Sequence, residues 1–340
     1  MKVGFWPQVY GNWIISDRPE VCDASFEYSK RSVLLAEELG FDTCLVAEHF
    51  FNPINPKLEQ LDAWTTCSAL AAVTSRIEII AAVKAGLRAP GVVAKMASNI
   101  DEISNGRFAI NVVSAWWRDE YEKMGAPFQE RGERYDRSEE YLTICKGLWT
   151  EDDYSYKGRY YTVKDATISP KPIQKPHLPI YFGGESEEGR ALAAKLADVF
   201  LLNGRQPREF GEVVKDMQRR AKMHNRNLRF GIAAFVICRE SDDAAQTEFD
   251  RLNGLRHVKI NSDRPDVAKL NESTKSYRRV GSNGGTDAGL IGTPEQIAER
   301  MHAFAAAGCE TFLLQFYPLI EELQRFGTEV LPPLRANKRH

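Results

Sequence analysis

The side chains best suited to chemistry follow directly after short apolar runs. Residues 43–47 form one such run, and Glu48 and His49 come next. A carboxylate beside an imidazole suits acid–base catalysis, because histidine changes its charge near neutral pH. A structural histidine held by a hydrogen bond explains the same pair equally well. We therefore take His49 as a candidate catalytic residue and keep the structural alternative open.

A second run, residues 108–113, contains an amide. Burial of Asn111 costs about 1–3 kcal/mol unless the amide is hydrogen-bonded, so it needs a partner in the core or on a ligand. Ser114 follows the run, and Trp116 and Trp117 then offer flat apolar surface for a ring or a small apolar substrate. This segment is a candidate binding surface.

Two segments have the composition of a phosphate site. Gly183, Gly184, Glu185 and Ser186 lead into a predicted helix. Glycines let the backbone approach a ligand closely, and the amide groups at a helix N-terminus favour an anion. Residues 131–138 add arginine, tyrosine and serine groups that bind phosphate oxygens. The structural alternatives are an ordinary N-cap at Ser186 and a solvated helix start at 131–138.

Eight apolar runs alternate with amphipathic stretches, and they must position these candidates. Continuous apolar strands between helices are typical of a parallel sheet covered on both faces, and eight such units favour a (β/α)₈ TIM barrel. The candidates, with Tyr317 after the last run, then share the C-terminal end of the barrel. That convergence indicates an enzyme that binds a phosphorylated aromatic cofactor. The runs are residues 3–6, 43–47, 77–82, 108–113, 179–182, 197–202, 230–237 and 311–314.

The length of 340 residues allows one large domain or two small ones, and the order of the motifs favours one barrel domain over residues 1–340. Lys and Arg number 45 against 47 Asp and Glu, and this balance does not support a dedicated nucleic-acid binder. The sequence contains no run of about 18 apolar residues, so no membrane span is expected. The N-terminus also lacks the pattern of a signal peptide. The six cysteines have no C-x-x-C spacing, so neither a zinc site nor a disulfide framework is expected. We expect a cytoplasmic protein without a bound metal.

Two segments interrupt the alternation and are expected as insertions at the C-terminal face. Residues 154–167 are predicted to form a hairpin that turns at Lys157 and Gly158. Residues 254–289 are polar, and a long polar loop in a compact domain is usually functional or disordered. In a barrel it would leave the seventh strand beside the site, so we predict a mobile lid, with a disordered surface excursion as the alternative.

The order of several motifs resembles that of the bacterial luciferase-like flavin monooxygenases. Within this family the chain is most similar to the dimethyl sulfone and alkanesulfonate monooxygenases, especially at residues 111–120, 148–152 and 234–237. The family motifs are ISNGRFAINVVS at 103–114, ERY at 133–135, SPKPIQKP at 169–176, YFGGES at 181–186 and LIGTPEQIAER at 290–300.

The resemblance implies a cofactor, a reaction and partners. Reduced FMN would come from a separate NAD(P)H-dependent flavin reductase, and O2 would be used to oxidise a small organosulfur compound with cleavage of a C–S bond. Family members are often dimers or tetramers, so a homo-oligomer is expected. Neither a nucleic acid nor a membrane is an expected partner.

The resemblance also implies roles for individual residues. Tyr135, Glu185 and Ser186 would hold the FMN phosphate region, while Asn111 and Ser114 would face the ring system. His49 corresponds to the catalytic histidine of the luciferases, although the sulfone enzymes differ there, and Tyr317 could donate a proton. The expected cofactor-binding residues are Ala82, Asn111, Ser114, Tyr135, Gly183, Gly184, Glu185 and Ser186, and the expected substrate-binding residues are Trp6, Trp116, Trp117, Phe235 and Arg279.

The chain departs from the alkanesulfonate enzymes where those enzymes place cations. Ala233, Phe235, Asn283 and Leu319 stand at these positions. A desolvated sulfonate needs cationic partners, because an unpaired buried charge is very costly. This departure favours a neutral substrate such as a sulfone. A nitrogen heterocycle, a sulfo-sugar and a flavin-binding protein without catalysis remain as alternatives.

Overall fold

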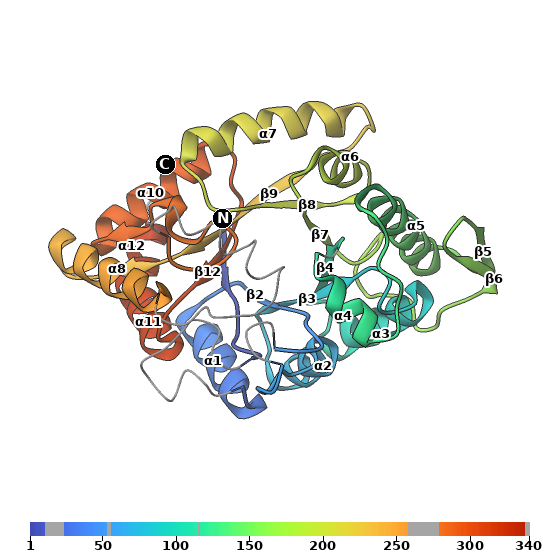
Figure 1. Ribbon diagram of the computed structural model, residues 1–340, viewed down its shortest axis with the longest axis horizontal. Helices are drawn as coiled ribbons and strands as arrows, with labels where there is room; N and C mark the ends of the chain where they lie inside the picture. Colours follow the sequence, from blue (N-terminus) through green and yellow to red (C-terminus); the bar gives the residue numbers. More distant parts are fainter. Residues whose placement is uncertain (11–23, 53–55, 115, 258–278, 337–340) are drawn as a thin grey trace.

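Eight parallel strands close into a barrel in the computed structural model, which describes residues 1–10, 24–52, 56–114, 116–257 and 279–336. Figure 1 shows the strands around a common axis with helices outside them. The predicted (β/α)₈ architecture is confirmed. In their order around the barrel, the strands are β1 (Lys2–Phe5), β12 (Thr311–Gln315), β9 (Arg229–Phe235), β8 (Val199–Leu202), β7 (Ile180–Gly183), β4 (Phe108–Val113), β3 (Glu78–Lys84) and β2 (Thr43–Val46).

The helices begin and end at residues that the sequence provides for this purpose. Ser25 accepts a hydrogen bond from the Tyr28 amide at the start of α1, and Gly40 ends this helix in the left-handed conformation. Asp62 caps α2 in the same way as Ser25 caps α1. The principal outer helices are α1 (Phe26–Leu39), α2 (Ala63–Val73), α3 (Pro90–Ile103), α5 (Arg131–Thr150), α6 (Glu187–Leu196), α7 (Pro207–Lys222), α10 (Pro294–Ala306), α11 (Leu319–Arg325) and α12 (Leu331–Ala336).

The interior of the barrel is filled at its middle and contains small side chains nearer the C-terminal end. The middle layer is a separate cluster that includes Leu45, Ile80, Ala109, Tyr181, Val199 and Leu313. Side chains of a strand alternate between its two faces, so the residues two positions further on also point inward. On three neighbouring strands these residues are Ala82, Asn111 and Gly183.

Strand β3 is longer than the run that we predicted. It continues to Lys84, two residues past the expected end at residue 82. The prediction ended the strand too early because a charged lysine is not expected inside an apolar strand. The extension places Lys84 on the inward-facing series of Ile80 and Ala82. The seventh run is instead divided into β9, which ends at Phe235, and β10 (Ile237–Cys238), which pairs with β11 (Ile291–Gly292).

The two segments that interrupt the alternation differ in their placement. Strands β5 (Tyr154–Lys157) and β6 (Thr162–Ala166) form an antiparallel hairpin. Glu140 of α5 accepts hydrogen bonds from the amides of Arg159, Tyr160 and Tyr161, so the hairpin loop lies against the outer helix. Of residues 254–289, α8 (Asp242–His257) covers the start, and 258–278 lie outside the described residues.

Residues 279–289, the described end of this second segment, are held against the barrel by hydrogen bonds. The Gln315 side chain accepts a hydrogen bond from the Ser282 amide at 2.9 Å and donates one to the Ser282 carbonyl at 3.2 Å. The Gly204 amide, after β8, donates to the Asn283 carbonyl at 2.7 Å. A short helix, η2 (Gly285–Ala288), follows. Residues 280–289 therefore join the ends of β8, β9 and β12.

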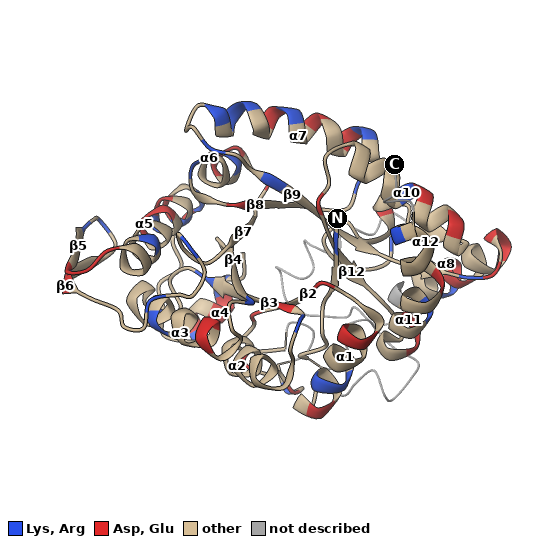
Figure 2. Ribbon diagram, turned by 180° about the vertical axis from the view of Figure 1, so that it is seen from behind, with Lys and Arg blue, Asp and Glu red and all other residues tan. Residues whose placement is uncertain are grey.

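Charged residues of both signs are interspersed on the outer helices. Figure 2 shows the alternation most clearly along α7. On this helix Asp216 pairs with both Arg219 and Arg220, and Arg220 also pairs with Glu187 of α6. No helix among the described residues has the length and apolarity needed to cross a membrane.

Candidate functional site

A buried triad of charged and polar side chains lies at the C-terminal end of the barrel. His49 follows β2, Lys84 ends β3, and Glu120 belongs to the short helix α4 (Arg118–Lys123). His49 Nδ1 is 3.2 Å from Glu120 Oε1 and 3.0 Å from Lys84 Nζ. Lys84 Nζ donates to Glu120 Oε2, and the Phe50 amide donates to Glu120 Oε1 at 2.8 Å. Three elements thus place three titratable groups in contact.

Burial and mutual contact shift the pKa values of all three groups. Burial lowers the pKa of His49 below 6.5, and the charge of Lys84 adds to this effect although the hydrogen bond to Glu120 opposes it. Burial also lowers the pKa of Lys84, against the attraction of Glu120. For Glu120, burial acts to raise the pKa, but the hydrogen bond from His49 and the charge of Lys84 outweigh it and lower the pKa. At neutral pH, His49 is uncharged beside an anionic carboxylate.

Aromatic rings enclose the imidazole of His49. Trp116 and Trp117 stack with ring centroids 6.1 Å apart, and both lie near His49, at 6.1 and 5.8 Å. Tyr10 meets the imidazole edge-on from another side at 6.3 Å. Trp117 is buried, whereas Trp116 remains 46% exposed. Trp116 is therefore the ring that a ligand at this end could cover.

A second charged network fixes the residue before His49. Glu48 is buried, and it accepts hydrogen bonds from the Lys84 amide at 2.7 Å and from Arg88 Nε at 2.9 Å. Arg88 also pairs with Asp62, the N-cap of α2. This network holds Glu48 and engages the Arg88 guanidinium. The Arg88 guanidinium thus has two carboxylate partners within the chain.

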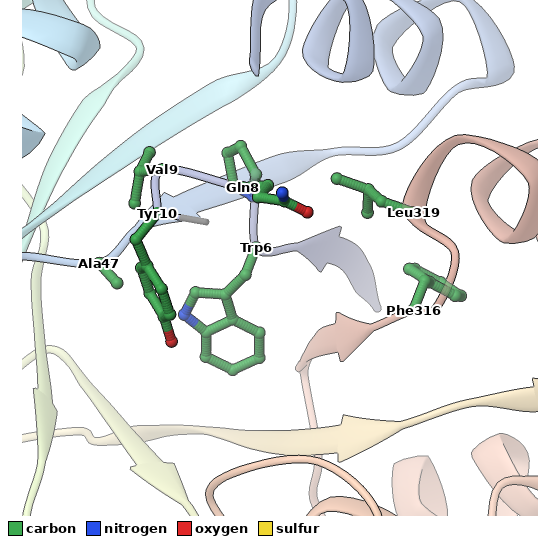
Figure 3. A pocket seen from close by; sticks show the side chains of 8 residues that line it. Trp6, Gln8, Val9, Tyr10, Ala47, Phe316 and Leu319 are labelled. Carbon is green, nitrogen blue, oxygen red and sulfur yellow. The ribbon is translucent and has the colours of Figure 1, made fainter. Parts of the chain in front are cut away.

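A pocket with about 340 Å³ of empty space, open to solvent, lies next to this triad. Figure 3 shows Trp6 with Tyr10 and Ala47 on one side and Phe316 and Leu319 on the other. Its lining residues carry no charged side chain. They are Trp6, Pro7, Gln8, Val9, Tyr10, Ala47, Phe316 and Leu319.

Strand β4 presents an amide with an unmet hydrogen bond to the barrel interior. Asn111 is only 8% exposed, and its Oδ1 has no hydrogen-bond partner among the described residues. Ala82 lies opposite Asn111 in the register of β3 and β4. The nearby Ser114 hydroxyl is 3.0 Å from Ser138 Oγ, which itself donates to the Arg134 carbonyl. Ser114 is thus the donor to Ser138, and its own lone pairs remain available.

The predicted phosphate segment forms a compact turn at the start of α6. A Cβ at Gly184 would lie 3.3 Å from the Tyr135 hydroxyl, and a Cβ at Gly189 would collide with the Gly184 carbonyl. The glycines therefore allow the turn to close against Tyr135. Ser186 is the N-cap of α6, and its hydroxyl accepts from the Gly189 amide at 3.2 Å. The N-cap alternative is thus true of Ser186, whose hydroxyl also hydrogen-bonds the Glu188 carboxylate.

The structure gives two other predicted residues internal partners. Glu185 pairs with Arg205 and accepts from the Asn203 amide at 2.8 Å. Arg279 pairs with Asp287 of η2. Both charges are compensated within the chain.

Tyr317 and Phe235 lie apart from the triad. Both are buried in a small cluster with Val280 and residues of α8. Tyr317 is only 2% exposed, although it directly follows Phe316 of the pocket. The structure therefore brings together His49, Trp6, Trp116 and Trp117, and separately Tyr135, Gly184 and Ser186, while Tyr317 and Phe235 pack against the 280–289 segment.

The sequence analysis did not identify two residues of the triad as site residues. Lys84 follows the run that we took to end at residue 82, and Glu120 stands in a polar segment after the tryptophans. The signal for Lys84 was its even spacing from Ile80 and Ala82, which share one face of a strand. Glu120 had no such signal, because only the tertiary fold brings α4 beside β3.

Comparisons with known proteins agree with this fold. The family model described as luciferase-like monooxygenase matches residues 7–311. An FMNH2-dependent dimethylsulfone monooxygenase from Pseudomonas putida is 33% identical over 347 positions, covering 98% of this chain and 95% of the relative. A protein of the same description from Pseudomonas fluorescens is 31% identical, with 98% and 94% covered.

Solved structures with low sequence identity share the architecture. A riboflavin lyase superposes with a TM-score of 0.83 at 17% identity, covering 99% of this chain and 92% of the other. DmoA from Hyphomicrobium sulfonivorans superposes with a TM-score of 0.78 at 18% identity, with 100% and 89% covered. At these identities the likeness concerns the fold.

Proposed function

Because the chain belongs to the luciferase-like monooxygenase family, we propose that it is the oxygenase of a two-component, reduced-FMN-dependent system. It uses O2 to oxidise a small uncharged organosulfur compound, a sulfone, with cleavage of a C–S bond. A separate NAD(P)H-dependent flavin reductase supplies the reduced FMN. The two relatives described as FMNH2-dependent dimethylsulfone monooxygenases support this proposal over nearly the whole chain.

The observation that carries the choice of a sulfone is the absence of charge from the pocket lining. A sulfonate bound against these eight side chains would find no cationic partner among them, and an anion that loses water without such a partner is disfavoured. Four cations at the C-terminal end of the barrel, Lys84, Arg88, Arg205 and Arg279, each already pair with a carboxylate. Leu319 stands where the alkanesulfonate enzymes are expected to place a histidine, and it lines the pocket.

The residues at the barrel mouth fit FMN. The unpartnered Oδ1 of Asn111 would accept a hydrogen bond from an N–H of the ring, and the Ser114 hydroxyl has acceptor capacity left. Ala82 and Gly183 are small enough to leave room for a flat ring inside the strands. Tyr135 of α5 and Ser186, the N-cap of α6, would hold the phosphate. When bound, reduced FMN supplies the electrons for the activation of O2.

The chain's own side chains bind the substrate and control water and protons. Trp6 and Leu319 offer apolar contacts to the alkyl groups of a sulfone, and Trp116 can cover the entrance. His49, uncharged at neutral pH, can donate or accept a proton at the edge of the pocket. Exclusion of water at such a site protects reactive oxygen species from side reactions.

A coupled assay tests the proposed function. The protein would be incubated with NADH, FMN, a flavin reductase, O2 and either dimethyl sulfone or methanesulfonate. Oxidation of one methyl group of the sulfone would give a sulfinate, an aldehyde and water, whereas a sulfonate would give sulfite. We expect sulfinate from the sulfone and at least tenfold lower turnover of the sulfonate.

Each other outcome has a defined meaning. Preferred turnover of the sulfonate would refute the neutral-substrate argument. Product from a pyrimidine or a sulfo-sugar alone would replace the organosulfur assignment. Tight binding of oxidised FMN without product from any of these compounds would identify a non-catalytic flavin-binding protein. The expected homo-oligomer stays a prediction, which sedimentation of the same sample tests.

A further inference from the structure

The contacts of His49 involve one ring nitrogen and two groups of opposite charge. Among the described residues, its hydrogen-bond contacts all use Nδ1, with Lys84 Nζ at 3.0 Å and Glu120 Oε1 at 3.2 Å. Lys84 can only donate, and an ionised Glu120 can only accept. Nδ1 therefore has a partner of the correct kind whether or not it carries the hydrogen.

These two partners support two tautomers without movement of any heavy atom. When Lys84 donates to Nδ1, the ring hydrogen is on Nε2. When Nδ1 carries the hydrogen, it donates to Glu120 Oε1, and Nε2 is a base. The side chains of Lys84 and Glu120 are 4% and 0% exposed, so bulk water does not compete for these positions.

We propose that Lys84, Glu120 and His49 form a proton relay, in which Lys84 is the proton source and Glu120 is the residue that holds the relay in place. The proton on His49 Nε2 passes to an oxygen at the reaction centre. The Lys84 ammonium passes a proton to Nδ1, and the new Nδ1–H donates to Glu120. One proton leaves the triad, Lys84 becomes a neutral amine, and no electrons are exchanged. Lys84 regains its proton between turnovers, when product has left and water re-enters the site.

The relay rests on the proposed monooxygenase function, since that reaction places one oxygen atom of O2 in the product and the other in water. The water oxygen needs protons in a site from which solvent is excluded. The groups that face the triad are consistent with this role. Tyr10 has its pKa raised by burial, so it remains protonated, while Glu48 and Arg88 neutralise each other beside Lys84.

The first test measures the relay without any turnover. The pKa of His49 would be measured by NMR titration in the wild-type protein, with the signal assigned by loss in His49→Gln. Lys84→Met should raise the pKa of His49, because a cation disappears and Glu120 loses its other partner. Glu120→Gln should lower it. An unchanged pKa of His49 in Lys84→Met would overturn the relay.

The second test measures turnover with the reductase present. We expect kcat to fall at least tenfold in Lys84→Met, with KM within twofold of wild type. Lys84→Arg keeps the charge but cannot release a proton, so it should be equally impaired. Wild-type kcat in Lys84→Arg, or in Lys84→Met, would overturn the proposal. If the wild type itself oxidises no substrate, the proposed function fails, while the NMR titration still tests the triad.

A matched control separates the relay from general destabilisation. Glu37, at the opposite end of the barrel, is buried and accepts hydrogen bonds from Ser75, as Glu120 accepts from Phe50 and Lys84. Glu37→Gln makes the same change of charge and shape as Glu120→Gln. We expect it to leave kcat and the pKa of His49 unchanged. Equal loss of kcat in both variants would show that the effect of Glu120 is only structural and overturn its place in the relay.

Discussion

Replacement of Asn111 by leucine should stabilise the FMN-free protein and weaken the binding of FMN. The Asn111 side chain is only 8% exposed, and its Oδ1 lacks a hydrogen-bond partner among the described residues. An unsatisfied buried polar group costs about 1–3 kcal/mol, and leucine of similar size removes that penalty. We expect a gain of about 1 kcal/mol in the free energy of unfolding, or roughly 2 °C in Tm for a chain of this size.

The same substitution removes a hydrogen bond from the bound cofactor. A hydrogen bond contributes a net free energy of about 0.5–1.5 kcal/mol, and 1.4 kcal/mol corresponds to a factor of ten in Kd. Asn111→Leu should therefore raise the Kd for FMN by roughly threefold to tenfold. Thermal unfolding without FMN and fluorescence titration with FMN measure the two effects separately.

Asn52 provides the matched control for this prediction. Its side chain is also buried, at 0% exposure, but its Nδ2 donates to the Glu59 carbonyl at 3.3 Å. Asn52→Leu should lower the free energy of unfolding by about 1–3 kcal/mol, because the carbonyl is left unpaired. The reasoning is refuted if Asn111→Leu destabilises the protein as much as Asn52→Leu does and leaves the Kd for FMN unchanged.

The other predictions concern the phosphate turn, the pocket and the response to pH. Tyr135→Phe combined with Ser186→Ala should weaken FMN binding more than tenfold in the same titration; unchanged affinity would place the phosphate elsewhere. Leu319→Arg introduces a cation into the pocket, so methanesulfonate should become a substrate while kcat/KM for dimethyl sulfone falls; sulfonate left unused in the coupled assay would contradict this. Burial acts to raise the pKa of Glu37, but hydrogen bonds from Ser75 and Arg76 outweigh it and lower the pKa below 4.5. The stability that this carboxylate adds is therefore present above pH 4.5 and lost as pH falls through its folded pKa, so denaturation of Glu37→Gln and wild type should converge in acid.

The neutral pocket has a consequence for specificity. A site that lacks cations rejects anions by the cost of their desolvation rather than by any repulsive group. Such rejection is strong for a sulfonate and weak for other uncharged molecules of similar size. We therefore expect the enzyme to accept several short sulfones, with the upper limit set by the space between Trp6 and Leu319.

The architecture and most strand positions were predictable because their signals are local. Apolar runs of four to eight residues, together with caps such as Ser25, Gly40 and Asp62, define the elements without knowledge of their neighbours. The order of the motifs along the chain then indicated the family. Errors occurred where a charge continued a strand, as at Lys84, and where a bend divided one, between Phe235 and Ile237.

The amino-acid sequence by itself determined the barrel, the family and the residue types at the strand ends, because alternation and motif order are properties of the chain. Only the tertiary structure decided which of those residues are free to act. Arg88, Arg279 and Glu185 have the types expected of ligand-binding residues, yet each is neutralised by a partner that only the fold brings beside it. Lys84 and Glu120 gave little signal, yet both contact His49. Whether a charge is available depends on what faces it across the barrel mouth, and that is fixed by how β3, α4 and the loop after β2 pack together.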